Sequence, residues 1–131
     1  MKITGIRTFL MQVGQPDPSN WASDHRPGGA TSKQFGGTRN WLFLKIDTDE
    51  GITGIGECSG WPRVVETAIH DLAPLLIGED PAHIERLWQK MHITMMGHGM
   101  LGTVGGGAMT GIDTALMMPS TLARAASSSA I

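Results

Sequence analysis

The stretch Thr48-Asp49-Glu50-Gly51-Ile52-Thr53-Gly54-Ile55-Gly56-Glu57 decides the fold of this chain. Its Asp49-Glu50-Gly51 segment predicts a tight turn, because glycine adopts positive φ without steric cost. Residues 40–48, before the turn, alternate in the manner of a strand, and one face carries Leu42, Leu44 and Ile46. Residues 52–57 are expected to form a second strand, which pairs antiparallel with the first.

The second strand of this hairpin lacks side chains on one face. Gly54 and Gly56 leave that face bare, which permits the close approach of another element. Residues 2–13, at the start of the chain, are rich in Ile, Thr, Phe, Leu and Val and predict a further strand. The intervening residues 14–38 contain three prolines and five glycines, and we expect a long, poorly ordered loop.

Helical periodicity follows the strands. Pro62 suits the first turn of a helix, and Gly78 suits its end. The apolar positions between them have helical spacing: Val65, Ala68, Ile69, Leu72 and Leu76. Asp80-Pro81 predicts the N-cap and first turn of a second helix. Its apolar stripe is Ile84, Leu87, Trp88, Met91 and Met95. A glycine-rich connector at residues 97–107 leads to a third helix at residues 108–116.

Pro119 is expected to end the third helix, because proline lacks the N–H group and its ring clashes with the preceding turn. The chain is therefore expected to divide into a compact domain, residues 1–117, and a disordered or weakly structured tail, residues 118–131. The predicted fold class is α+β: a three-stranded antiparallel meander followed by a small bundle of about three helices.

Composition narrows the function classes. The chain has 131 residues and a formal net charge of −2, with acidic and basic residues interspersed, so no nucleic-acid partner is expected. No apolar run approaches the length of a membrane span, and the N-terminus lacks the pattern of a signal peptide. Cys58 is the only cysteine, which excludes an internal disulfide and fits a reducing compartment. We expect a soluble, cytoplasmic protein.

Three motifs occur in a fixed order. The hairpin quoted above is the first, Ile77-Gly78-Glu79-Asp80-Pro81 with Ile84-Glu85-Arg86-Leu87-Trp88 is the second, and Gly111-Ile112-Asp113-Thr114-Ala115-Leu116 is the third. Together they resemble the N-terminal capping domain of the enolase superfamily, in its mandelate racemase and muconate lactonizing enzyme branch. The resemblance is strongest to the sugar-acid dehydratases and covers residues 1–116; the tail resembles nothing in the family.

The resemblance implies a division of labour. A C-terminal β/α barrel carries the Mg²⁺ ligands and the acid/base groups that remove a proton beside a carboxylate. The capping domain closes the barrel mouth with two loops, here residues 14–38 and 57–63, which exclude water and select the substrate. The candidate specificity residues for a sugar acid are His25, Arg26, Trp61 and Arg63. The barrel is absent, so no catalytic or metal-binding residue is carried over to this chain.

Other motifs carry less weight. Residues 97–102 match a dinucleotide fingerprint by letter but follow a helix instead of a strand, so a flexible connector is favoured. His70, His83 and His92 are expected at helix surfaces without metal-ligand spacing. Glu57 is interpreted as a structural hydrogen-bond acceptor instead of a general base, and Cys58 as a small buried residue.

The sequence therefore favours a capping domain of a Mg²⁺-dependent dehydratase or racemase, truncated before its barrel and inactive alone. Two alternatives stay open. One is an interaction module whose barrel-facing surface forms a homo-oligomer or docks on a homologous enzyme. The other is a free-standing small-molecule binder that uses the long loop.

Overall fold

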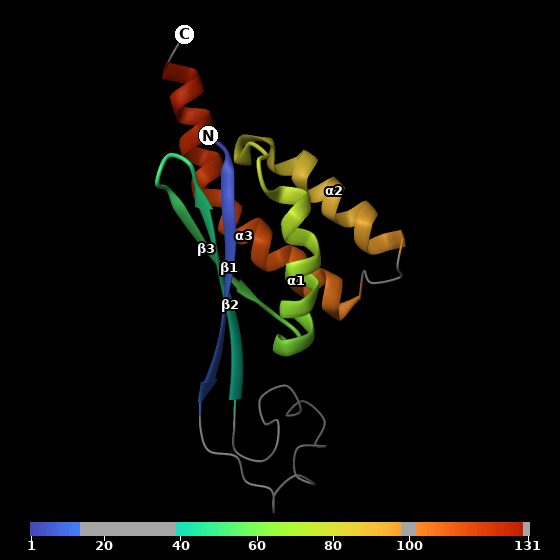
Figure 1. The fold of residues 1–131 in the computed structure, drawn as a ribbon. Coiled ribbons are helices and arrows are strands. Elements are labelled where there is room, and N and C mark those ends of the chain that lie inside the picture. Colours follow the sequence, from blue (N-terminus) through green and yellow to red (C-terminus); the bar gives the residue numbers. More distant parts are fainter. Residues whose placement is uncertain (14–38, 98–101, 130–131) are drawn as a thin grey trace, which may run out of the picture.

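A computed structural model describes residues 1–13, 39–97 and 102–129 of the chain. Three strands form one antiparallel sheet in the order β1-β2-β3: β1 (Ile3–Val13), β2 (Arg39–Thr48) and β3 (Thr53–Cys58). The helical half follows in sequence: α1 (Pro62–Leu76), the 3-10 turn η2 (Pro81–His83), α2 (Ile84–Gly97) and α3 (Thr103–Ser129). The predicted α+β class, a meander followed by three helices, is confirmed (Figure 1).

The predicted hairpin turn joins β2 to β3. Gly51 has φ of 76°, and its amide donates to the carbonyl oxygen of Thr48 over 3.2 Å. The Thr48 amide donates in turn to the carbonyl oxygen of Ile52 over 3.1 Å. The positive φ explains why glycine is needed at this position. No helix in the described part of the chain is long and apolar enough to cross a membrane.

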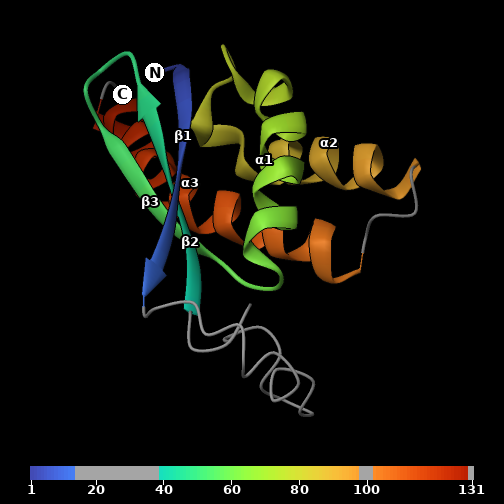
Figure 2. The same cartoon turned by 60° about the horizontal axis from the view of Figure 1, so that its bottom comes forward.

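The two faces of the sheet have different neighbours. On β2, Leu42, Leu44 and Ile46 are fully buried, whereas Trp41, on the opposite face of the strand, is 44% exposed. The helices lie on one side of the sheet, and the other side is uncovered by any described element (Figure 2). We call these sides the covered face and the open face. The alternation read from residues 40–48 therefore predicted the correct buried set.

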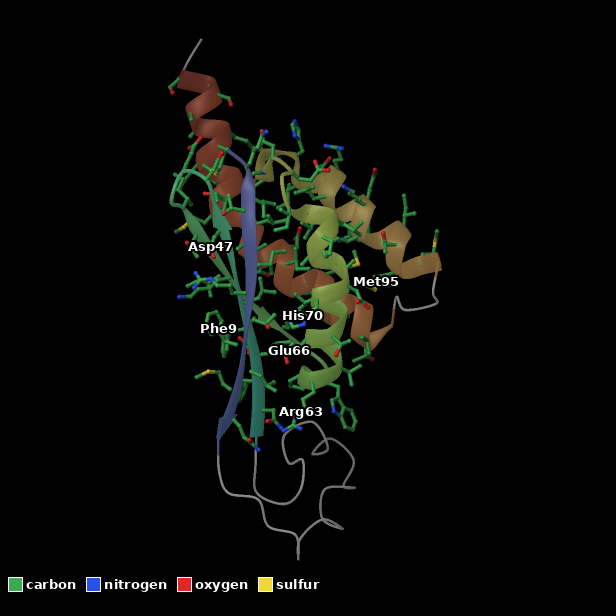
Figure 3. The ribbon with its side chains drawn as sticks, viewed as in Figure 1. Phe9, Asp47, Arg63, Glu66, His70 and Met95 are labelled. Atoms are coloured by element: carbon green, nitrogen blue, oxygen red, sulfur yellow. The ribbon has the colours of Figure 1, made fainter. Side chains whose placement is uncertain are left out.

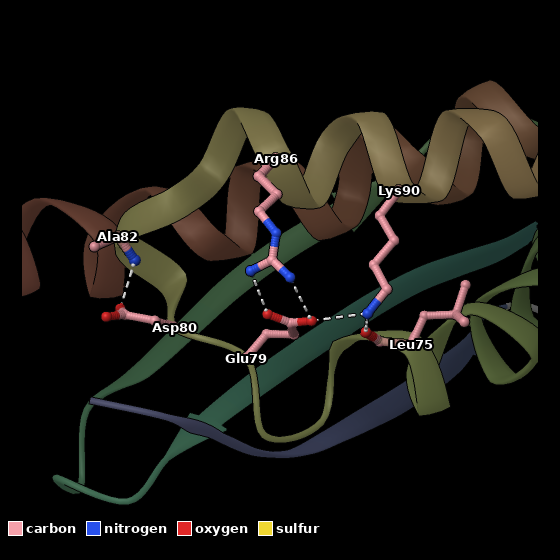
Figure 4. A network of polar contacts seen from close by, with 6 residues as sticks. All are labelled: Leu75, Glu79, Asp80, Ala82, Arg86 and Lys90. Atoms are coloured by element: carbon pink, nitrogen blue, oxygen red, sulfur yellow. Dashed lines mark hydrogen bonds and ion pairs between the residues drawn. The ribbon is translucent and has the colours of Figure 1, made fainter.

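A charged network holds the start of α2 against the end of α1. Glu79 accepts hydrogen bonds from Arg86, over 2.9 Å, and from Lys90, over 2.8 Å (Figure 4). The Lys90 ammonium also donates to the carbonyl oxygen of Leu75, which would otherwise lack a helical partner near the end of α1. Asp80 caps η2 as predicted, because its side chain accepts from the Ala82 amide over 2.9 Å.

β3 and α3 pack closely together at two glycines. A Cβ atom placed on Gly54 would overlap the carbonyl oxygen of Ala115, and one on Gly56 would overlap that of Gly111. The glycine Cα hydrogens therefore face two helix carbonyls that are one turn apart, the geometry of weak Cα–H···O contacts. The bare strand face predicted from the two glycines is where this helix packs.

The predicted end of the third helix is wrong. α3 continues through Pro119 to Ser129, and it also begins earlier than predicted, at Thr103. Pro119 lies inside the helix, so the Ala115 carbonyl has no N–H partner four residues on; that carbonyl points at Gly54 instead.

Tertiary contacts continue past the proline and stabilise the last turns. Pro119, Ser120 and Ala123 are buried, and the Arg124 guanidinium donates to the carbonyl oxygen of Ala82 over 3.1 and 3.2 Å. Packing of this kind overrides the local preference of proline to end a helix. Residues 118–129 are therefore helical, not weakly structured, and the proposed domain boundary after residue 117 stays a prediction.

Candidate functional site

Both candidate loops start from the same end of the sheet. Val13 at the end of β1 pairs with Arg39 at the start of β2, so the two ends of segment 14–38 are neighbours. β3 finishes beside them, since Cys58 pairs with Leu42, and α1 begins shortly after at Pro62. We call this the loop end of the molecule, defined by Val13, Arg39, Cys58 and Trp61.

Trp61 and Arg63 are both available at the loop end. Trp61 precedes the first residue of α1, is 47% exposed, and its carbonyl accepts from the Val65 amide over 2.9 Å. Arg63 is exposed in the first turn of α1 and lies near the loop end (Figure 3). Neither side chain has a hydrogen bond or ion pair to another described residue. The structure therefore places both predicted residues at the loop end, without a side-chain partner among the described residues.

The short loop before α1 is held by α3. A Cβ atom on Gly107 would overlap the carbonyl oxygen of Ser59. Gly60 has φ of 95°, and a Cβ atom there would lie 3.1 Å from Thr103. These contacts require glycine on both sides, since any side chain would separate the loop from the helix. The first turns of α3 therefore fix the position from which Trp61 and Arg63 extend.

The other two candidates, His25 and Arg26, lie outside the described residues, as does the expectation of poor order in residues 14–38. Residues 98–101, the centre of the dinucleotide-like motif, also lie outside them. The described residues show only that segment 14–38 is flanked by the paired residues Val13 and Arg39, at the end of the sheet where β3 finishes at Cys58.

Sequence reasoning missed a polar row on α1. The Thr8 hydroxyl donates to Glu66 Oε1 over 2.8 Å and lies 3.1 Å from His70 Nε2. Glu66 and His70 are one helical turn apart, and Arg63 precedes them on α1 toward the loop end (Figure 3). The three-and-four spacing of these residues is the signal that could have revealed the row. His70 was predicted to lie at the helix surface, and it is exposed there.

Glu57 and Cys58 illustrate the two faces at the end of β3. Glu57 is exposed on the open face and has no hydrogen bond to another described residue, so the structural role predicted for it is wrong. Cys58 is buried on the covered face against Gly111, as predicted. Burial, reinforced by the neighbouring Glu57 carboxylate, raises the pKa of the Cys58 thiol to about 11. A thiol this protonated is a poor nucleophile at neutral pH.

The described residues supply no metal site. They contain no group of three or more His, Cys, Asp or Glu side chains that could hold an ion. Mg²⁺ prefers several oxygen ligands in octahedral geometry, so this part of the chain does not fit the ion that the resemblance implies. A Mg²⁺ site would need donors from elsewhere.

Comparison with protein families gives one match across most of the chain. The model described as "Mandelate racemase / muconate lactonizing enzyme, N-terminal domain" matches residues 24–129. The match includes Arg39, Cys58 and Trp61 of the loop end, the three motifs and the whole of α3.

Curated relatives are sugar-acid dehydratases. The chain is 50% identical over 78 residues to the D-galactonate dehydratase of Xanthomonas campestris pv. campestris (strain B100), covering 58% of this chain and 20% of that protein. It is 47% identical over the same length to the D-galactonate dehydratase of Ralstonia pickettii (strain 12J), with the same coverage. The chain therefore spans about a fifth of the length of these relatives.

Solved structures share the fold. The 3,6-anhydro-D-galactonate cycloisomerase from Zobellia galactanivorans matches with a TM-score of 0.72 and 25% identity, over 95% of this chain and 29% of that one. A member of the enolase superfamily from Polaromonas sp. JS666 matches with a TM-score of 0.70 and 28% identity, over 95% of this chain and 31% of that one.

Proposed function

Because the chain belongs to the mandelate racemase/muconate lactonizing enzyme family through its N-terminal domain, we propose that it is the substrate-selecting cap of a sugar-acid dehydratase. The observation that carries the proposal is the 50% identity to D-galactonate dehydratases over 78 residues. The loop end supports it, because it presents an unpaired guanidinium and a half-exposed indole from a fixed position.

The residues at the loop end suit the recognition of a sugar acid. The Arg63 guanidinium has a planar array of donors that can bind a carboxylate or several hydroxyl groups at once. The Trp61 indole offers an apolar face with a polar edge, which suits the C–H face of a polyol chain. In this proposal both residues bind and orient the substrate, together with His25 and Arg26 of the long loop.

The reaction itself would depend on residues outside this chain. The described residues hold neither a metal-binding donor set nor a reactive thiol. We therefore expect the isolated chain to turn over no sugar acid, with or without Mg²⁺. We also propose a cytoplasmic location, on the ground of the single cysteine.

A chimera tests the proposal with the barrel restored. The region of the Xanthomonas campestris D-galactonate dehydratase that aligns with this chain is replaced by this chain, and dehydration is assayed on a panel of sugar acids. We expect activity in the chimera and none in the isolated chain. Arg63→Gln should raise KM, with a smaller effect on kcat, because Arg63 binds the substrate without touching the reacting atoms.

Lys2→Gln provides a matched control, since Lys2 is an exposed cation before β1, far from the loop end. A folded chimera that lacks activity on every sugar acid would contradict the proposal. Equal kinetics for the Arg63→Gln and Lys2→Gln chimeras would remove Arg63 from the substrate site.

A further inference from the structure

A groove lies between α2 and α3. The two helices lie alongside each other (Figure 2), and two adjoining open hollows of about 350 and 490 Å³ lie between them. We call this the α2–α3 groove. Trp88 and Asp113 line both hollows, and the remaining walls include Glu85, Met109 and Met117.

Asp113 has an unusual environment for a carboxylate. It is half-buried in the middle of α3, and it has no hydrogen bond or ion pair to another residue in the described ranges. Burial raises the pKa of Asp113 above its ordinary value. A carboxylate in this position gains stability from an incoming cation, because the cation offsets the loss of water around the charge.

Trp88 supplies a second feature that suits a cation. Its indole is 42% exposed and stacks on the His92 ring, with centroids 4.7 Å apart and an interplanar angle of 18°. The stack fixes the orientation of the indole beside Asp113. An aromatic face next to a carboxylate binds a guanidinium by cation–π attraction and charge pairing together.

The charge of the groove is one-sided. Glu85 adds a second carboxylate to the hollow that contains Asp113 and Met117, and no lysine or arginine among the described residues lines either hollow. The Met109 and Met117 side chains are flexible and apolar, so they can adapt to the stem of a long side chain. The groove is therefore complementary to a basic side chain carried on an apolar segment.

We propose that the α2–α3 groove binds a polypeptide segment that places an arginine side chain against Asp113 and Trp88. The segment comes from the part of the longer relatives that this chain does not span, about four-fifths of their length. Arginine is favoured over lysine because its planar group stacks on an indole while it pairs with a carboxylate. The identity of the partner rests on the proposed function; the shape and charge of the groove do not.

A peptide scan tests the inference on the full chain. Fifteen-residue peptides that tile the Xanthomonas campestris D-galactonate dehydratase outside its 78 matched residues are added to ¹⁵N-labelled protein. Binding is followed through the Trp88 indole N–H signal, which is assigned by its loss in Trp88→Phe. We expect one or a few overlapping peptides to shift this signal, each of them containing an arginine.

Two matched changes identify the contact. Replacing the peptide arginine by citrulline removes the charge and keeps the shape, and Asp113→Asn does the same on the protein. Each should weaken binding by about tenfold to a hundredfold, the range for a partly buried hydrogen bond to a charged group. Glu57→Gln, on the open face of the sheet, should leave the affinity unchanged. Circular dichroism confirms that the variants fold alike.

The outcomes separate this inference from the proposed function. Absence of binding at millimolar peptide, or equal binding by the citrulline peptide or by Asp113→Asn, overturns the inference. An active chimera combined with no peptide binding leaves the proposed function standing and the inference refuted. Specific peptide binding combined with an inactive chimera supports the inference and refutes the proposed function.

Discussion

The covered and open faces of the sheet are built from the same three strands, yet they have opposite relations to the rest of the molecule. The covered face carries fully buried side chains such as Leu44 and two glycines that touch the backbone of α3. The open face carries Phe9, Met11, Trp41 and Ile55, each between 37 and 60% exposed.

This difference shows where the fold is determined and where it is adaptable. On the covered face, backbone atoms of β3 and α3 are so close that a single added carbon has no space. On the open face, side chains project into solvent, so a change there alters a surface and not a packed interior. The predictions below test this contrast, from the largest expected effect to the smallest.

Gly56→Ala should produce the largest effect. The new methyl group would overlap the Gly111 carbonyl oxygen, so α3 must move away from β3 along its length. We expect a loss of about 3 kcal/mol or more in the free energy of unfolding, at the upper end of the range for an overpacked interior. Urea unfolding followed by circular dichroism measures the change.

Gly97→Ala is the control for this substitution. Gly97 lies at the end of α2 with nothing within 4 Å of an added Cβ atom. The free energy of unfolding of the variant should therefore differ from that of the wild type by about 0.5 kcal/mol at most. Equal unfolding midpoints for the two alanine variants would mean that the β3–α3 contact is looser than the structure shows.

The reactivity of the Cys58 thiol measures whether the covered face stays packed. Its pKa of about 11, against an ordinary value of 9.0, reduces the thiolate fraction at neutral pH by about a hundredfold. Reaction with a disulfide reagent should therefore be slow in the folded chain and fast after unfolding. Because the folded pKa is raised, stability should be constant below about pH 9 and fall as the pH rises toward 11. A fast reaction of the native protein at pH 7 would contradict this burial.

Glu79→Gln should lower stability less than Gly56→Ala does, and the loss should depend on pH. The hydrogen bond from Lys90, with the charge of Arg86, lowers the pKa of Glu79 below its ordinary value of 4.5. A lowered folded pKa stabilises the chain above pH 4.5, and this contribution is lost as the pH falls through the folded value. The wild type should therefore unfold at a higher temperature than the variant at pH 7, and this difference in unfolding temperature should narrow near pH 3.

Glu85→Gln, at an exposed position on α2, is the control. A difference in unfolding temperature between the wild type and Glu79→Gln that is independent of pH would contradict a stabilising role of the charge network.

The order of the elements could be predicted from the sequence because local signals agree there. The hairpin turn at Gly51, the N-cap at Asp80 and the burial of Leu42, Leu44 and Ile46 all follow from periodicity and turn chemistry. The end of α3 could not be predicted, because the helix around Pro119 packs against Gly54 of β3 and its later turns are anchored by Arg124. Those contacts join residues far apart in the sequence, and a local rule for proline contains no information about them.

The candidate site was predicted in part for the same reason. Trp61 and Arg63 were selected because they follow a strand end and open a helix; the structure places them at the loop end, and their role in substrate binding stays a prediction. The link between Thr8 and the α1 residues Glu66 and His70 was missed, since it depends on how α1 lies across β1. The role of Glu57 was wrongly predicted, because its acceptor function assumed a neighbour that the open face does not provide.

Ile55→Thr should have the smallest effect on folding and a measurable effect on association. Ile55 is 60% exposed on the open face, so its loss should change the free energy of unfolding by about 0.5 kcal/mol or less. The exposed apolar side chains around it form the kind of patch that drives weak association, so we expect the wild-type chain to self-associate at high concentration. Light scattering across a concentration series should show a smaller increase in mean mass for Ile55→Thr, and threonine keeps the β propensity of the strand. Ile93→Thr, at a comparably exposed position on α2, provides the control outside the sheet. If Ile93→Thr reduces association as much as Ile55→Thr does, then the helical surface, and not the open face, mediates contact between copies of the chain.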